Sequence, residues 1–523
     1  MKKLLLLLLG ALGALSIQAR TPRPRLIVQI VVGSMRAEDL DRYAAHFGEA
    51  GFRRLTEQGA RFTGARYDYQ QTTTPVSLAT LTTGAMPSTH GVIGSRWQDY
   101  TDNSTVWLTA GRKGDGPYHL IAPTLGETLV RQVPESRCVT VAAEAESAVV
   151  MGGRTDQVFW LDPQHAGWTT SYYYADSLPE WIARNNREHY TLSYIATPWR
   201  TLYDRTNYRN TRHWDIVPSG RTRKENDRKA PGAKRLKLIN DYERLLYTPA
   251  GNTAVLDFAK QAIAQFKLGA DTTPDLLNIC LDASRRISEA YGPESIEAED
   301  MYYRLDRDLA DFLTFLFAQV ENDEAVVILT SDHGTSPSYD LAATQADRFN
   351  ARQFEVIVNG FLNVRYGAGN WVTDYSGSCI RLNHNLIYER GLNLAEVQNE
   401  VAIFAMQFEG VSHALAATAM RTSYFGSGYA RRLQNSFYPR RSGDVILNLM
   451  PGWIEERDRC HSSSGSMYGY DTEVPLLFYG TGIASQRIRR RVDMTAIAPT
   501  VARLLEISEP AASEGEVLEE ITE

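Results

Sequence analysis

The feature that most restricts the fold is a short, nearly all-apolar run close to the start of the chain, Leu26 to Val32 (LIVQIVV). A strand that is apolar on both faces belongs in the middle of a parallel sheet covered on both sides. Runs of the same kind follow at 139–142, 276–281, 326–330 and 474–479, with helix-like stretches between them, for example at 253–266 and 298–319. This alternation predicts an α/β fold with a doubly wound, mostly parallel sheet flanked by helices.

Two stretches interrupt the alternation. Residues 157–245 are rich in Trp, Tyr and Arg and are expected to form an inserted cap. Residues 351–421 hold their own short strand-like runs and a helix at 394–408, which predicts a small inserted α/β subdomain. The basic run from Arg221 to Lys237 is expected to be a solvated, mobile loop, because dense like charge resists burial.

The first residues predict export. Lys2 and Lys3 precede an apolar core from Leu4 to Leu15, and a cleavage site after Ala19 fits a secretory signal at 1–19 with a mature chain of 20–523. The apolar core is too short to span a bilayer, no lipid-accepting Cys follows it, and no later segment predicts a transmembrane helix. We therefore expect a periplasmic or secreted protein. Its net charge of −7 and pI of about 5.9 give no reason to expect a nucleic-acid partner.

The four cysteines fall into two groups. Cys138 and Cys280 adjoin apolar strand-like runs and are expected to be small buried residues. Cys379 and Cys460 lie in loop-like surroundings and are candidates for a disulfide in an oxidising compartment, a pairing that the sequence leaves open.

Thr74 begins a helix-like stretch and has two interpretations. A Thr followed by Pro75 is a typical helix start, with the Thr side chain as N-cap. The alternative is a nucleophilic hydroxyl, because the free N–H groups and dipole of a helix N-terminus favour an alkoxide and a phosphate.

Four further sequence segments follow Thr74 along the chain. They are residues 84–97 (GAMPSTHGVIGSRW), Ser331-Asp332-His333-Gly334 after a strand, residues 470–480 (YDTEVPLLFYG) and residues 493–506 (DMTAIAPTVARLLE). Together they resemble the type I phosphodiesterase/nucleotide pyrophosphatase branch of the alkaline phosphatase superfamily, and most closely the bacterial phosphate-irrepressible periplasmic alkaline phosphatases. The resemblance runs from about Leu26 to about Leu518. It implies one alkaline phosphatase-like domain over 20–523, two zinc ions, a Thr or Ser nucleophile and phosphoric-ester hydrolysis by two-metal catalysis.

The resemblance places only three of the expected metal-site residues in this chain. Thr74 stands at the nucleophile position, and Asp332 and His333 match an Asp-His pair that holds the nucleophile-side zinc. Asp332 and His333 also have a purely structural interpretation, in which the carboxylate caps a turn and bonds the imidazole.

The other expected ligands are replaced. Gly33 and Arg285 occupy positions where the family has Asp ligands, and Glu289 and Ser464 occupy positions where it has His ligands. His461 lies close to Ser464 in the sequence, so a short shift of the alignment would make it a substitute ligand. The substrate-binding positions change too: Ser95 stands for an Asn, and Glu144 and Glu146 for a Lys and an Arg that grip phosphate. Two anions in place of two cations would repel a phosphate dianion, and a guanidinium at position 285 would place a fixed cation where a metal was bound.

Three hypotheses follow. The first is a pseudo-phosphatase with impaired two-metal chemistry, no metal, and a role in binding a ligand such as a phosphate ester or an envelope protein. The second is an active phosphoric-ester hydrolase with an altered or single divalent metal, held by Asp332, His333, Glu289, Asp282 or His461, with Thr74 as nucleophile. The third is a structural component that uses the aromatic side chains of the first insertion as a contact face, namely Trp160, Trp168, Tyr172, Tyr173, Tyr174 and Trp181.

Overall fold

The computed structural model describes most of the chain. It covers residues 23–162, 164–165, 167–196, 198–212, 243–320, 324–340, 346–457 and 460–522. The predicted signal at 1–19 and the basic run at 221–237 lie outside these residues. Within them, no helix has both the length and the apolar character needed to cross a bilayer.

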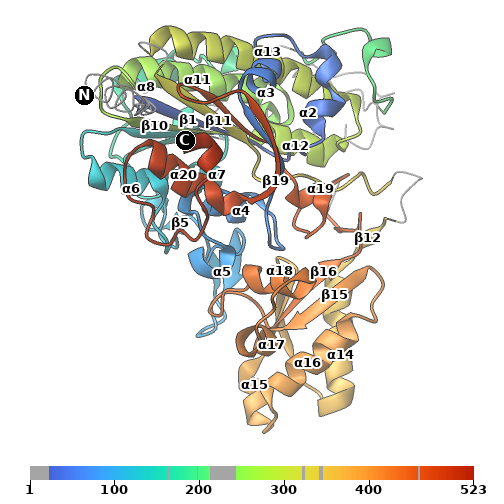
Figure 1. Cartoon of the computed structure of the whole chain (residues 1–523). Coiled ribbons are helices and arrows are strands. Elements are labelled where there is room, and N and C mark those ends of the chain that lie inside the picture. Colours follow the sequence, from blue (N-terminus) through green and yellow to red (C-terminus); the bar gives the residue numbers. More distant parts are fainter. Residues whose placement is uncertain are drawn as a thin grey trace, which may run out of the picture.

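A nine-stranded mixed sheet forms the centre of the molecule (Figure 1). Its strand order is β19 (Gln486–Asp493), β2 (Ala60–Arg66), β18 (Leu476–Gly480), β11 (Ala325–Thr330), β1 (Leu26–Val32), β10 (Asp275–Leu281), β7 (Cys138–Ala142), β8 (Gln157–Leu161) and β9 (Trp168–Thr169). The five strands from β11 to β8 are parallel, whereas β18 runs antiparallel to both of its neighbours. The predicted α/β class with a mostly parallel sheet is confirmed.

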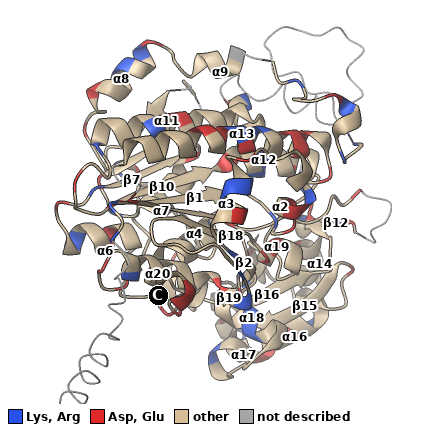
Figure 2. Cartoon of the chain, turned by 45° about the horizontal axis from the view of Figure 1, so that its top comes forward, with Lys and Arg blue, Asp and Glu red and all other residues tan. Residues whose placement is uncertain are grey.

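Two layers of helices cover the faces of this sheet (Figure 1). Side chains alternate along a strand, so Val28 and Ile30 of β1 face one layer and Ile27 and Val31 face the other. The first layer holds α11 (Ala250–Phe266), α12 (Asp282–Tyr291) and α13 (Ile296–Gln319), and the second holds α4 (Thr74–Thr83), α6 (Leu125–Gln132), α7 (Ala145–Gly152) and α20 (Ile497–Leu504). Acidic and basic residues are interspersed along α11 and α13, where Lys260 pairs with Asp257 and Arg304 with Asp300 (Figure 2).

A smaller α/β unit lies below the main body (Figure 1). Its four-stranded antiparallel sheet has the order β13 (Val372–Ser376), β14 (Cys379–Leu382), β16 (Val445–Leu449) and β15 (Val411–Ala416). Helices α14 (Ala351–Tyr366) and α16 (Leu394–Ala405) pack on it around a core of their own. The unit therefore reaches past the expected range of 351–421, because β16 supplies its central pairing.

The first insertion begins later than residue 157, since β8 and β9 pair within the central sheet. Most of its aromatic side chains face inward: Trp160 and Trp168 are buried, and Trp168 and Trp181 pack on Phe258 of α11. Only Tyr172 among the six is largely exposed. The contact-face hypothesis therefore lacks an aromatic surface.

All four cysteines lie in the described residues, are buried and form no disulfide. The open question of a Cys379–Cys460 disulfide is thus answered for this structure, in which the two are not joined. The Cys379 sulfur instead accepts a hydrogen bond from the Gln71 amide at 3.2 Å.

The central strands should dominate stability. Ile279 in β10 is fully buried between two parallel neighbours. We expect Ile279→Ala to lower the free energy of unfolding by about 2–5 kcal/mol, because it removes buried methyl groups and leaves a cavity. Val356→Ala on α14, where the side chain is 66% exposed, should change it by less than about 0.5 kcal/mol. Denaturant unfolding measures both, and equal effects would contradict the assigned core.

Candidate functional site

A cavity of about 510 Å³ lies between the main body and the smaller unit. Segments that follow parallel strands of the sheet reach it: Arg285 and Glu289 after β10, His333 after β11, and Glu144 and Glu146 after β7. Ligand sites of open α/β sheets collect at this edge. The smaller unit closes the other side with residues 375–378 and 448–455.

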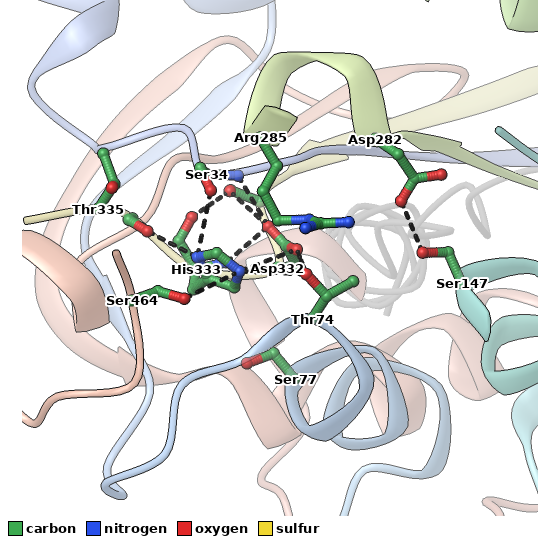
Figure 3. Close-up of polar contacts among 12 residues, drawn as sticks. Ser34, Thr74, Ser77, Ser147, Asp282, Arg285, Asp332, His333, Thr335 and Ser464 are labelled. Atoms are coloured by element: carbon green, nitrogen blue, oxygen red, sulfur yellow. Dashed lines mark hydrogen bonds and ion pairs between the residues drawn. The ribbon is translucent and has the colours of Figure 1, made fainter. Parts of the chain in front are cut away.

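Thr74 enters the cavity at the start of α4 but does not cap the helix. The N-cap residue is Thr73, and the Thr74 hydroxyl instead donates to Asp332 Oδ2 at 2.7 Å, with His333 Nε2 at 3.2 Å (Figure 3). The capping interpretation of Thr74 is therefore wrong. Its hydroxyl is held by side chains from the end of β11, as a positioned nucleophile or a structural hydrogen-bond donor would be.

Asp332 and His333 are buried and bonded within the protein. Asp332 Oδ1 accepts the backbone N–H groups of Ser34 and His333, both at 2.9 Å. His333 Nδ1 lies 2.6 Å from the Gly334 carbonyl oxygen, which can only accept, so Nδ1 carries the proton. His333 Nε2 lies 3.2 Å from the Thr74 hydroxyl oxygen and 3.2 Å from Asp332 Oδ2.

Arg285 occupies the centre of the site (Figure 3). Its guanidinium contacts Glu144 at 2.7 Å and Glu289 at 3.4 Å, and its side chain is 12% exposed. Burial opposes the charge, but the carboxylates of Glu144, Glu289, Asp282 and Asp332 outweigh burial and raise the pKa of Arg285. A permanent cation is therefore surrounded by four carboxylates.

Gly33 lies against the first turn of α12. A Cβ atom at Gly33 would lie 2.9 Å from Arg285 Cβ, 3.2 Å from the Arg285 backbone nitrogen and 3.2 Å from the Leu281 carbonyl oxygen. These neighbours are backbone or the base of a side chain and cannot swing away. The backbone spacing therefore leaves no room for an aspartate at this position.

The carboxylates around Arg285 differ in their ionisation. Burial raises the pKa of Glu144, but Arg285 and Arg286 overcome this and lower it to about 2. Burial and then the Glu144 charge raise the pKa of Asp282 to about 7. Asp282 is fixed by hydrogen bonds from the Ala143 and Glu144 N–H groups and from the Ser147 hydroxyl.

The remaining predicted residues divide between the site and its surroundings. Ser464 lies in the cavity wall with its hydroxyl 3.5 Å from His333 Nε2. His461 lies farther along the same loop, 3.5 Å from Asp340 and stacked near Tyr339. The structure therefore places Ser464, and not His461, beside the Asp332–His333 pair. Ser95 donates to Glu146 at 2.8 Å on the opposite wall.

Sequence reasoning missed two residues that shape the site. Ser34 and Gln71 adopt the left-handed region with φ of 58° and 67°, which costs about 1–3 kcal/mol for a residue with a side chain. Ser34 presents its N–H to Asp332, and Gln71 precedes the Thr74 segment. Only the Gly33-Ser34 turn signal after the first strand pointed to either of them.

The family profile described as type I phosphodiesterase / nucleotide pyrophosphatase matches residues 27–471. The chain belongs to this family. It is 28% identical to "Alkaline phosphatase PafA" of Elizabethkingia meningoseptica over 98% of this chain and 97% of the relative. It is also 28% identical to a protein of Myroides odoratus named "Calcium-transporting ATPase", over 96% and 95%. The crystal structure of wild-type PafA superposes with a TM-score of 0.86 at 27% identity and covers 96% of this chain and 99% of that one. These matches confirm the alkaline phosphatase superfamily and its fold, while the names of relatives do not decide the chemistry of this site.

The residues of this chain do not fit two zinc ions. Zinc in proteins is held by carboxylate, imidazole or thiolate groups at short distances. Gly33 supplies no donor atom, Arg285 supplies a cation and Ser464 supplies a neutral hydroxyl. In the described part of the chain, no group of three or more His, Cys, Asp or Glu residues is arranged to hold a metal ion.

Asp282 gives the cluster a measurable pH dependence. Its folded pKa of about 7 exceeds the ordinary value of 3.8, so the folded protein holds a proton that the unfolded chain loses. The contribution of Asp282 to stability is present below about pH 4 and is lost as the pH rises through about 7. We expect Asp282→Asn to become progressively more stable relative to wild type between pH 4 and pH 7, with a constant difference above it. Chemical unfolding across this range measures the difference. Asp204→Asn, at an exposed site, should show a flat difference, and parallel profiles for Asp282→Asn and wild type would contradict the assignment.

Proposed function

We propose that the protein is a pseudo-phosphatase. It has the fold of the family but does not hydrolyse phosphate esters by two-metal catalysis, and it acts by binding a ligand in the cavity. The observation that carries the proposal is Arg285, whose guanidinium is ion-paired with Glu144 and Glu289 where the resemblance expects metal ligands. A guanidinium supplies positive charge but cannot activate water as a metal ion does.

Three further features support loss of hydrolysis. Gly33 lies too close to α12 to carry a ligand side chain. Both carboxylate oxygens of Asp332 accept hydrogen bonds from donors within the protein. Glu144 and Glu146 stand where the resemblance expects cations that grip phosphate, so the cavity offers repulsion to a phosphate dianion at these positions.

Export is part of the proposal. The pattern of Lys2, Lys3 and the Leu4–Leu15 core supports a cleaved secretory signal, and hence action in the periplasm or outside the cell. The partner would then be a small molecule or an envelope component.

A residual hydrolase is the second candidate, because one observation favours it. Thr74 lines the cavity, and its hydroxyl donates to Asp332 and lies 3.2 Å from His333 Nε2. A base beside a hydroxyl is a nucleophile arrangement.

Metal content and turnover separate these candidates. We expect mature protein incubated with Zn²⁺ or Mg²⁺ and then desalted to hold far less than one metal per chain. Hydrolysis of p-nitrophenyl phosphate and bis(p-nitrophenyl) phosphate should not exceed that of Thr74→Ala, because the water-activating ion is missing. Stoichiometric metal with turnover that Thr74→Ala abolishes would overturn the pseudo-phosphatase and establish the hydrolase.

Restoring one ligand should not restore the metal site. We expect Gly33→Asp to lower the free energy of unfolding by about 1–3 kcal/mol, since its Cβ overlaps the first turn of α12. We expect no gain in zinc affinity by calorimetry. The matched control is Gly360→Asp on α14, where a Cβ meets nothing within 4 Å and stability should stay near wild type. Tight zinc binding by Gly33→Asp would show that the backbone spacing is no barrier.

A further inference from the structure

The charged side chains that line the cavity differ in whether they have an ion-pair partner. All four of its arginines have carboxylate partners: Arg96 with Asp374 at 3.7 Å, Arg285 with Glu144 at 2.7 Å and Glu289 at 3.4 Å, Arg286 with Glu144 at 2.6 Å, and Arg457 with Glu455 at 3.8 Å. An anionic ligand would therefore have to compete for each of these cations with a carboxylate of the protein.

Two other carboxylates that line the cavity have no ion-pair partner among the described residues. Glu146 accepts a hydrogen bond from the Ser95 hydroxyl at 2.8 Å, and no ion pair joins it to any described residue. Asp471 is 1% exposed and accepts from the Ser466 N–H and hydroxyl through Oδ2 only. Both carboxylates are thus bonded to neutral groups.

Some residues that line the cavity also carry buried acceptor atoms without donors. Asp471 Oδ1, Gln70 Oε1 and Gln71 Oε1 have no hydrogen-bond partner among the described residues, and all three residues line the cavity. Gln70 and Gln71 are 1% and 3% exposed. Two further buried atoms of the lining residues also lack a partner: the Thr73 hydroxyl oxygen, and Arg285 Nε, which belongs to a guanidinium already held by two carboxylates. The wall as a whole has an excess of acceptors, and each unpaired one costs free energy until a donor meets it.

We propose that the cavity binds a ligand that carries a positively charged, hydrogen-donating group, an ammonium or a guanidinium, placed against Glu146. This rests on the proposed loss of hydrolysis and names the ligand class of the same site. A cation with several N–H donors complements the Glu146 carboxylate and the unpaired acceptors, whereas a phosphate dianion complements neither.

The rest of the cavity suits an organic cation. Trp107, Tyr375, Trp453 and Tyr470 line it, and Trp107 is 55% exposed. Aromatic faces attract ammonium and guanidinium groups and also bury the apolar part of a ligand. Burial and the charge of Glu144 raise the pKa of Glu146, so a ligand cation would relieve a repulsion that exists in the free protein. A volume of about 510 Å³ accommodates a small organic molecule.

A matched set of probes tests the ligand class. Benzylamine, benzyl alcohol and benzyl phosphate share a ring and differ in charge at neutral pH. Binding to the unmodified mature protein is followed by calorimetry and by tryptophan fluorescence, with a chelator present. We expect benzylamine to bind most tightly and benzyl phosphate most weakly. In Glu146→Gln, which keeps the size and an acceptor for Ser95, the affinity for benzylamine should fall by about tenfold, the worth of a charge-assisted hydrogen bond, and approach that for benzyl alcohol.

A control variant and the order of the three probes together decide the result. Glu188→Gln, an exposed acid of α8 (Glu180–Arg187) at its C-cap, should leave all three affinities unchanged. If Glu146→Gln does not fold, the order of the three probes on the unmodified protein still decides. Benzyl phosphate binding as tightly as benzylamine, equal affinities, or no binding of benzylamine at the highest concentration would each overturn the proposal. Thr74-dependent release of phosphate from benzyl phosphate would instead overturn the proposed function, and it is scored separately by product analysis.

Discussion

The buried guanidinium of Arg285 is the interaction on which the organisation of this site depends. It lies among Glu144, Glu289, Asp282 and Asp332, which come from three different parts of the chain. Removing a cation from water is costly, and only close, well-bonded anions compensate for it. Such a cluster contributes little net stability compared with an apolar core, but breaking it would leave several buried charges without partners. It therefore fixes the relative positions of β7, β10 and β11 at their carboxyl ends.

The position of α12 also constrains the backbone at the end of β1. Because α12 begins close to β1, Gly33 has neither side chain nor space for one. The next residue, Ser34, takes a left-handed conformation and turns its N–H toward Asp332. Asp332 in turn holds the Thr74 hydroxyl. The carboxylate that the resemblance expects to bind a metal is thus occupied by donors of the protein.

The fold was largely predictable from the sequence because buried parallel strands have a distinctive composition. The strand Leu26–Val32 has the predicted bounds, and β7, β10 and β11 begin one residue earlier than predicted. The run at 474–479 was also found, as β18 at Leu476–Gly480, but it is antiparallel, and an apolar run carries no information about direction. The insertion boundaries were less accurate since β8 and β9 pair at the sheet edge, a long-range contact that aromatic composition does not reveal.

The sequence predicted which residues would gather at the site but not the contacts that they make with one another. Order and spacing indicated which residues would gather after the strands, yet the contact between Arg285 and Glu144 joins residues 141 positions apart. The sequence also suggested a capping role for Thr74, but Thr73 holds the N-cap position and its side chain makes no capping hydrogen bond. Contacts between residues far apart in the sequence depend on how the helices pack on the sheet, and local sequence patterns do not determine that packing.

The distribution of satisfied and unsatisfied groups distinguishes a remodelled site from a decayed one. Loss of metal ligands by random substitution would leave buried carboxylates without compensation, at a cost of several kcal/mol each. Here Glu144 has two arginines, Glu289 has one and Asp332 has four hydrogen-bond donors. The buried atoms that remain unsatisfied in the residues lining the cavity are mostly acceptors. The carboxylates around Arg285 and Asp332 are thus compensated, whereas several acceptors of other lining residues are not, and this is the distribution that the proposed binding role predicts.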